Sequence, residues 1–309
     1  MKSNKRKCYP EILNHCYQNT VDGGLIFYSV SDYLVFYTIA SVVASRSPVR
    51  VVKMCLMFDH IHFSIISPSK TALCDYMRDC TSWYAKEFNE LTGRKGRLFR
   101  HSFGSVPVVG DKKARSNLIY VDNNPVERKL VERAEEYRWN FLAYTVSDNP
   151  FSEPLVIRRA RYSLQRAISE IKRSYGLGYP LNYSQLRRLF ARLDRSESEQ
   201  LTDYILTTYR FIDYEYALRC FGDYETMILA DHSTTGSEHN LNELFVGKTD
   251  VHYKTMIQLV MRSGPFKDVH DVLKLSVDEK HEWLLFLMKH TEAPPEQIGK
   301  FLHLPLIKR

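Results

Sequence analysis

Two adjacent segments of the chain carry strand-like apolar patterns. Residues 49–58, VRVVKMCLMF, form an almost continuous apolar run, and residues 60–66, HIHFSII, follow directly after Asp59. Apolar, β-branched runs of this length predict strands, and the short polar break predicts a hairpin between them. Because successive strand side chains point to opposite faces, His60 and His62 share one face, and the isoleucine and phenylalanine that follow them share the other.

The pattern around this hairpin predicts an α+β fold. A strand is expected at 13–20, a helix with Ser or Asp near its start at 29–46, a helix ended by Gly at 69–93, a strand at 96–105 and a helix ended by Pro125 at 111–125. The resulting order, β-α-β-β-α-β-α, is that of a ferredoxin-like antiparallel sheet with one added helix.

A change in composition divides the chain. Residues 144–154, YTVSDNPFSEP, contain two prolines and are expected to be a linker. Almost every segment beyond it has helical periodicity, except an exposed loop expected at 231–240. We therefore predict a catalytic domain over 1–150 and an all-α domain over 151–309.

The end of the chain resembles a DNA-reading motif. Residues 278–306 have the proportions of a helix, a short turn and a second helix. In such a motif Gln297 and Lys300 would lie on the recognition helix. Two packed helices without that role are also common, so both interpretations stay open.

Charge and cysteine content fit an intracellular protein with a polyanionic partner. The 309 residues carry a formal charge of +7, which suits nucleic acid without proving it. The six cysteines have no C-x-x-C spacing, and the basic N-terminus lacks the apolar core of a signal peptide. No apolar run is long enough to span a bilayer. We expect a cytoplasmic protein with free thiols.

A second polar constellation follows the hairpin in sequence. Tyr120 and Asn124 lie four residues apart on the predicted helix 111–125, so they can share one helical face. Pro125 disfavours the α conformation at Asn124, however, and the side chain of Asn124 can instead leave the end of the helix.

Three motifs together resemble a known family. They are the pair His60-Ile61-His62, the Tyr-x-x-x-Asn-Pro segment of residues 120–125, and Tyr-Arg-Trp at 137–139. The combination is similar to the REP-associated tyrosine transposases, the single-tyrosine branch of the HUH single-stranded DNA transposases. The resemblance covers roughly residues 10 to 145. Tyr137 and Trp139 are expected to be core anchors, and Arg138 a salt-bridge or phosphate contact.

The resemblance implies a chemistry for these residues. His60, His62 and Asn124 would hold a divalent metal, Mg²⁺ or Mn²⁺, and Tyr120 would attack DNA to form a 5′-phosphotyrosine. A phosphodiester repels a nucleophile, so a cation beside it lowers the barrier to attack. A phenol also leaves readily, so a free 3′-hydroxyl can rejoin the strands without ATP.

The third ligand remains open. Asp122 and Asn123 precede Asn124 directly, and either could take its position. A mixed nitrogen and oxygen set suits Mn²⁺ and permits Mg²⁺.

The resemblance also implies a partner, single-stranded DNA with palindromic hairpins, bound by a monomer or homodimer. Arg97, Arg100 and His101 are basic enough to follow a DNA backbone, although a solvated face explains them equally well. His15 and Gln18 are expected to be ordinary sheet residues.

Three functions remain under consideration. The leading one is a transposase that cleaves and rejoins hairpin-forming single-stranded DNA. The alternatives are a domesticated, non-cleaving DNA-binding protein of the same fold and a rolling-circle-type HUH nuclease. An intact set of His60, His62 and Tyr120 favours an enzyme, and the Asn-Pro and Tyr-Arg-Trp segments disfavour the rolling-circle nuclease.

Overall fold

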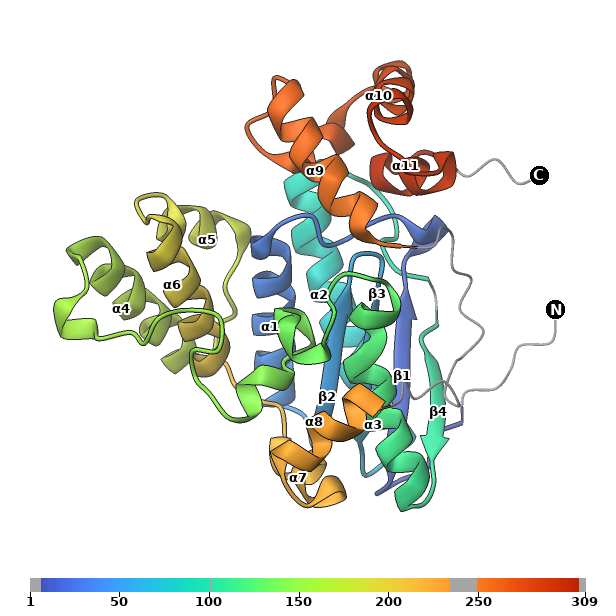
Figure 1. Ribbon diagram of the computed structural model, residues 1–309, viewed down its shortest axis with the longest axis vertical. Helices are drawn as coiled ribbons and strands as arrows, with labels where there is room; N and C mark the ends of the chain where they lie inside the picture. The colour runs from blue at the N-terminus through green and yellow to red at the C-terminus, as the bar shows by residue number, and fades with distance from the viewer. Residues whose placement is uncertain (1–6, 101, 234–248, 306–309) are drawn as a thin grey trace.

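An antiparallel sheet with strand order β2-β3-β1-β4 organises the first half of the protein (Figure 1). The computed structural model describes residues 7–100, 102–233 and 249–305. The order of elements is that of the predicted ferredoxin-like fold with one helix added. The elements are β1 (Leu13–Asn19), α1 (Val30–Ala44), β2 (Arg50–Met57), β3 (His60–Ile66), α2 (Lys70–Thr92), β4 (Gly104–Val108) and α3 (Asp111–Glu127).

The two faces of the sheet are covered by different helices. Phe63 of β3 packs against Phe36 of α1 and Tyr76 of α2, with ring centroids 6.3 and 5.9 Å apart. His62, the neighbour of Phe63, faces Tyr120 of α3 instead. The alternation of apolar and polar side chains along β3, predicted from the sequence, therefore places an apolar layer under α1 and α2 and a polar layer under α3.

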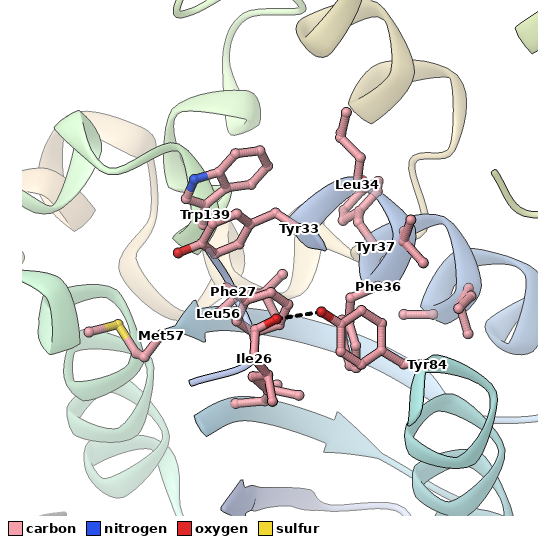
Figure 2. Packing of buried hydrophobic residues seen from close by; sticks show 14 of the residues in the cluster. Ile26, Phe27, Tyr33, Leu34, Phe36, Tyr37, Leu56, Met57, Tyr84 and Trp139 are labelled. Carbon is pink, nitrogen blue, oxygen red and sulfur yellow. Dashed lines mark hydrogen bonds between the residues drawn. The ribbon is translucent and has the colours of Figure 1, made fainter. Parts of the chain in front are cut away.

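Aromatic side chains fill the apolar layer, as Figure 2 shows. Tyr84 donates its hydroxyl to the backbone oxygen of Ile26 at 2.6 Å. Trp139 stacks on Tyr33 with ring centroids 4.3 Å apart, and Tyr137 donates to a backbone oxygen of β2. The predicted role of Tyr137 and Trp139 as core anchors is confirmed.

The predicted linker is tied to the helices that follow it. Asp203 accepts hydrogen bonds from Tyr144, the Phe151 amide and Ser152. Arg138 pairs with the same carboxylate at 3.3 Å. Of the two roles expected for Arg138, the structure therefore supports the salt bridge.

Two predicted boundaries are wrong. Strand β4 begins at Gly104, and in the described part of the stretch before it Phe99 forms an isolated bridge with Thr20. Helix α3 does not end at Pro125 but continues to Glu127. Proline has no amide to donate, and its ring crowds the carbonyl of the preceding turn, which is why a helix end was predicted there. The helix nevertheless continues past it, and the Arg128 amide donates to the Asn124 oxygen at 3.1 Å.

The described part of the second half is helical, as predicted. Helices α5 and α6 lie beside α1, with α4 packed on both of them, and α7 and α8 lie beside α3. Helices α9 to α11 gather at the top of the view (Figure 1). None of the described helices is both long and apolar enough to cross a membrane. Most of the predicted loop 231–240 lies outside the described residues. The helices are α4 (Tyr162–Gly176), α5 (Tyr183–Phe190), α6 (Arg195–Thr208), α7 (Tyr214–Phe221), α8 (Tyr224–Ser233), α9 (Val251–Ser263), α10 (Val277–His290) and α11 (Pro295–Leu302).

A buried histidine connects the C-terminal region to the start of α1. His270 contacts Asp32 through Nε2 at 2.9 Å and Asp268 through Nδ1 at 2.5 Å. Burial disfavours the charged imidazole, but the two carboxylates outweigh it and raise the pKa of His270 to about 10. The C-terminal region is thus held to the sheet domain by charge as well as by apolar packing.

This contact predicts a dependence of stability on pH. The folded pKa of His270 lies above the ordinary value of 6.5, so its stabilising contribution is complete below about pH 6.5 and is lost as the pH rises through about 10. We expect the difference in free energy of unfolding between wild type and His270→Gln to shrink over that range. Denaturant titrations at a series of pH values measure it. His281→Gln, at an exposed histidine, is the control, and a constant His270 difference contradicts the prediction.

Candidate functional site

The candidate residues meet between β3 and α3. The rings of His60 and His62 lie 4.9 Å apart between centroids, and the rings of His62 and Tyr120 lie 5.6 Å apart. The exposed fractions of His60, His62 and Tyr120 are 3%, 0% and 2%. Two histidines and a tyrosine are thus assembled in a closed site, which a DNA strand can reach only if the segments around it move.

Helical geometry brings Asn124 to the same place. Asn124 lies one turn after Tyr120 within α3, and its amide donates to the Tyr120 backbone oxygen at 3.1 Å. Asn124 also hydrogen-bonds the side chain of His62. Burial, together with nearby His60 and Arg128, holds the pKa of His62 well below its usual value. His62 is therefore neutral near pH 7, the form that binds metals.

The structure separates the three residues considered for the third ligand position. Asp122 pairs with Lys53 of β2 at 2.5 Å, and Asn123 donates to the backbone oxygen of Asp231 in α8. Each of these two residues therefore has a partner outside the histidine pair. We take Asn124, which contacts His62, as the candidate third ligand.

His15 belongs to this site, contrary to the expectation that it is an ordinary sheet residue. Its Nε2 lies 3.2 Å from Nδ1 of His62, and its ring centroid lies 5.5 Å from that of Tyr120. Asn117 of α3 contacts the other ring nitrogen of His15 at 2.6 Å and accepts from Ser64. Strand register pairs His15 with Ser64. The sequence did contain a signal for this role. His15 lies on the first strand, and strand pairing places it opposite Ser64, which shares a face of β3 with His60 and His62. Gln18, by contrast, donates to the backbone oxygens of Asn19 and Arg100.

A charged cluster surrounds His60 at the hairpin turn. Asp59 contacts Nδ1 of His60 at 2.6 Å and Nζ of Lys300 at 3.3 Å. Burial disfavours the charged form of Asp59, but His60, Lys300 and Arg128 outweigh it and lower its pKa. Asp250, which precedes α9, has its pKa raised to about 6 by burial and by Asp59. The cluster therefore joins the hairpin turn to the C-terminal region.

The donor set fits a small divalent cation. Nδ1 of His60 contacts Asp59 and Nδ1 of His62 contacts His15, so Nε2 is the ring nitrogen of each that lies away from these neighbours. His62 can offer Nε2 to an ion in the tautomer that carries its proton on Nδ1. The amide oxygen of Asn124 would add a hard ligand. Within the described ranges, no group of three His, Cys, Asp or Glu side chains could hold an ion. Any site built on this pair therefore depends on Asn124, on water or on substrate.

Two of the three basic residues expected to contact DNA lie at an open groove. Arg97 and Arg100 are exposed and precede β4, not within a strand as predicted. With Arg78 of α2 they line a groove of about 400 Å³. His101 lies outside the described residues. Arg97 and Arg100 bring to this groove a chemistry that suits phosphates, whereas Arg78 is paired with Asp75 and Asp79.

The predicted recognition helix does not face solvent. The helix-turn-helix proportions are present as α10 and α11, but Gln297 is 0% exposed and Lys300 is 7% exposed. Gln297 donates to the Thr249 backbone oxygen, and Lys300 reaches Asp59. In this conformation neither side chain can read a base.

Comparisons with known proteins support the resemblance over part of the chain. Residues 29–124 match the family described as "Transposase IS200 like", a segment that contains His60, His62, Tyr120 and Asn124. No curated protein matches the chain. A solved structure described as "Structure of the REP associates tyrosine transposase bound to a REP hairpin" covers 47% of this chain and 86% of its own, with 16% identity and a TM-score of 0.41. We draw nothing from so distant a likeness.

Proposed function

We propose that this chain, in which residues 29–124 are an IS200-like transposase segment, cleaves and rejoins single-stranded DNA through Tyr120. The observation that carries the proposal is the meeting of His60, His62 and Tyr120 in one polar layer, with His62 and Tyr120 ring centroids 5.6 Å apart. Metal-assisted phosphodiester transfer needs at least a nucleophile close to the side chains that would hold the ion, here two imidazoles.

The reaction is a displacement at phosphorus. The hydroxyl oxygen of Tyr120 loses its proton and attacks the phosphorus, and the bond to the 3′-oxygen of the preceding nucleotide breaks. That oxygen leaves as a 3′-hydroxyl after gaining a proton, and the 5′ side remains attached to Tyr120. A 3′-hydroxyl from the same or another strand reverses the step, which rejoins DNA and frees the tyrosine.

The protein's own residues have separate tasks in this scheme. His60, His62 and Asn124 would hold Mg²⁺ or Mn²⁺, which when bound neutralises a non-bridging phosphate oxygen and the charge that develops on the leaving oxygen. Asp59 and His15 hold the two imidazoles by their Nδ1 atoms. Arg97 and Arg100 would hold the phosphates of a hairpin-forming strand.

One observation favours a second function, a DNA-binding protein that does not cleave. The candidate nucleophile is only 2% exposed, so the described conformation does not admit a strand to it. Such a protein would bind hairpins through the basic groove and would leave Tyr120 unmodified. Cleavage assays distinguish the two functions.

The first test is the role of the histidines. We expect His60→Ala and His62→Ala to abolish Mn²⁺-dependent nicking of a labelled single-stranded hairpin, because each removes a ligand. Hairpin affinity, which rests on many phosphate contacts, should fall by less than about tenfold. Gel assays measure both quantities.

The matched control is His232→Ala, at a partly exposed histidine paired with Glu135. It should leave nicking unchanged. Nicking that persists in EDTA, or an equal loss of nicking and binding in the His60 and His62 variants, would contradict the assigned role.

A further inference from the structure

We propose that helix α11 positions the candidate metal ligand His60, with Lys300 fixing the Asp59 carboxylate and Asp59 fixing the imidazole. This inference rests on the proposed function, since it concerns the same histidine. Lys300 lies far outside the matched segment 29–124, so the family match assigns it no role. Lys300 and Asp59 are positioning residues, because neither is expected to touch the ion or the DNA.

The first contact is between Asp59 and His60. Oδ1 of Asp59 lies 2.6 Å from Nδ1 of His60. An ionised carboxylate can only accept a hydrogen bond, so Nδ1 carries the proton and donates it. In the neutral ring the lone pair is then on Nε2. A carboxylate on the remote nitrogen is the usual way in which a metal-binding histidine is oriented and made more basic.

The second contact is between Asp59 and Lys300. Nζ of Lys300 lies 3.3 Å from Oδ2 of Asp59, the oxygen not used by His60. With one partner on each oxygen, the carboxylate cannot rotate without losing a charged contact. Arg128 and Asp250 also face this cluster, and they pair with each other at 3.8 Å. Lys300 contacts the second oxygen of Asp59, and Arg128 adds a further positive charge that lowers the pKa of Asp59.

Gly23 leaves room for the side chain of Lys300. Gly23 has φ +68, and a Cβ atom added there would come within 2.7 Å of Cε of Lys300. A residue with a side chain would be strained at this φ and would also push the lysine aside. The segment after β1 thus leaves room for the lysine to reach the hairpin turn.

The docking of α11 does not depend on the amino group. The Lys300 backbone oxygen accepts from the Leu25 amide at 3.3 Å, and the Phe301 oxygen accepts from the Tyr28 hydroxyl at 2.6 Å. His303 contacts the Leu25 oxygen at 2.7 Å. The apolar side chains of α11 are buried as well. Lys300→Met should therefore remove the charge and leave the helix in place.

The experiment compares the full-length wild type with Lys300→Met. One measurement is Mn²⁺ affinity from the electron paramagnetic resonance signal of free Mn²⁺, where we expect a loss of about 10-fold to 100-fold. The other is the ¹⁵N chemical shifts of His60 in ion-free protein, assigned with His60→Ala. At a pH at which the His60 ring is neutral, wild type should show a protonated Nδ1 and an unprotonated Nε2, and Lys300→Met should show averaged values from two tautomers.

Lys274→Met is the control, because Lys274 forms an exposed ion pair with Asp271 in the same region. It should match wild type in both measurements. The proposal is overturned if Lys300→Met keeps the wild-type tautomer and Mn²⁺ affinity, or if Lys274→Met changes them equally. Absence of Mn²⁺ binding by wild type would overturn the metal site of the proposed function. The tautomer of the ion-free protein would still decide whether Lys300 positions His60.

Discussion

Tyr120→Phe is expected to form no covalent adduct with DNA and to cleave a hairpin-bearing single strand more slowly by a factor on the order of 10³ or more. The substitution removes only the attacking oxygen. The ring that faces His15 and His62 at 5.5 and 5.6 Å remains, so the site should keep its packing. Hairpin affinity and the free energy of unfolding should stay close to those of wild type.

The measurement is direct. Wild-type protein is incubated with Mn²⁺ and a 5′-extended hairpin strand, the products are digested, and mass spectrometry locates the peptide that carries nucleotide. Tyr162→Phe, at a tyrosine that is 77% exposed, is the control and should form the adduct normally. An adduct on a peptide without Tyr120, or undiminished cleavage by Tyr120→Phe, would refute the proposed nucleophile. Lack of any adduct with wild type would favour the non-cleaving DNA-binding protein.

Local patterns were enough to predict the framework of the site. Alternation in HIHFSII placed His60 and His62 on one face of β3, and the polar layer under α3 confirms that placement. Ser29 caps the start of α1, and Gly93, in the left-handed conformation, ends α2, both as the sequence predicted. Such signals depend on residues within one or two turns of each other, so a single sequence contains them.

Contacts between distant segments could not be predicted in this way. Lys300 and Asp59 are 241 residues apart, and His270 and Asp32 are 238 apart. Nothing in the local pattern of α11 shows that its polar residues point inward, so Lys300 resembled a residue of a DNA-reading helix. His15 was undervalued for the same reason, because its partner His62 lies on another strand.

The Asp-Asn-Asn run before Pro125 is a further example. The sequence offered three polar residues for one ligand position and no means to separate them. Successive helical side chains point about 100° apart, so the three residues must face different surroundings. The partner of Asp122 is Lys53, whose place within the apolar strand 49–58 was the available signal that a buried acid lay nearby.

Lys53→Met is accordingly expected to be the most destabilising single substitution considered for this chain. Lys53 and Asp122 are each 1% exposed at the side chain, and Asp231 of α8 lies close enough for Asp122 and burial to raise its pKa to about 9. Asp231 is therefore protonated near pH 7, and Lys53 balances the charge of Asp122. Removal of the lysine leaves a buried carboxylate without its cation, which typically costs about 3–5 kcal/mol.

Chemical denaturation measures this loss, with Lys112→Met on the exposed start of α3 as the control. The double variant Lys53→Met, Asp122→Asn should regain part of the stability, because it removes the uncompensated charge together with the lysine. A Lys53→Met protein within about 1 kcal/mol of wild type would contradict the prediction.

Since Asp122 lies between Tyr120 and Asn124 on α3, the same pair fixes the rotation of the helix that presents both residues to the histidines. We therefore expect Lys53→Met to reduce nicking more strongly than the lost fraction of folded protein explains.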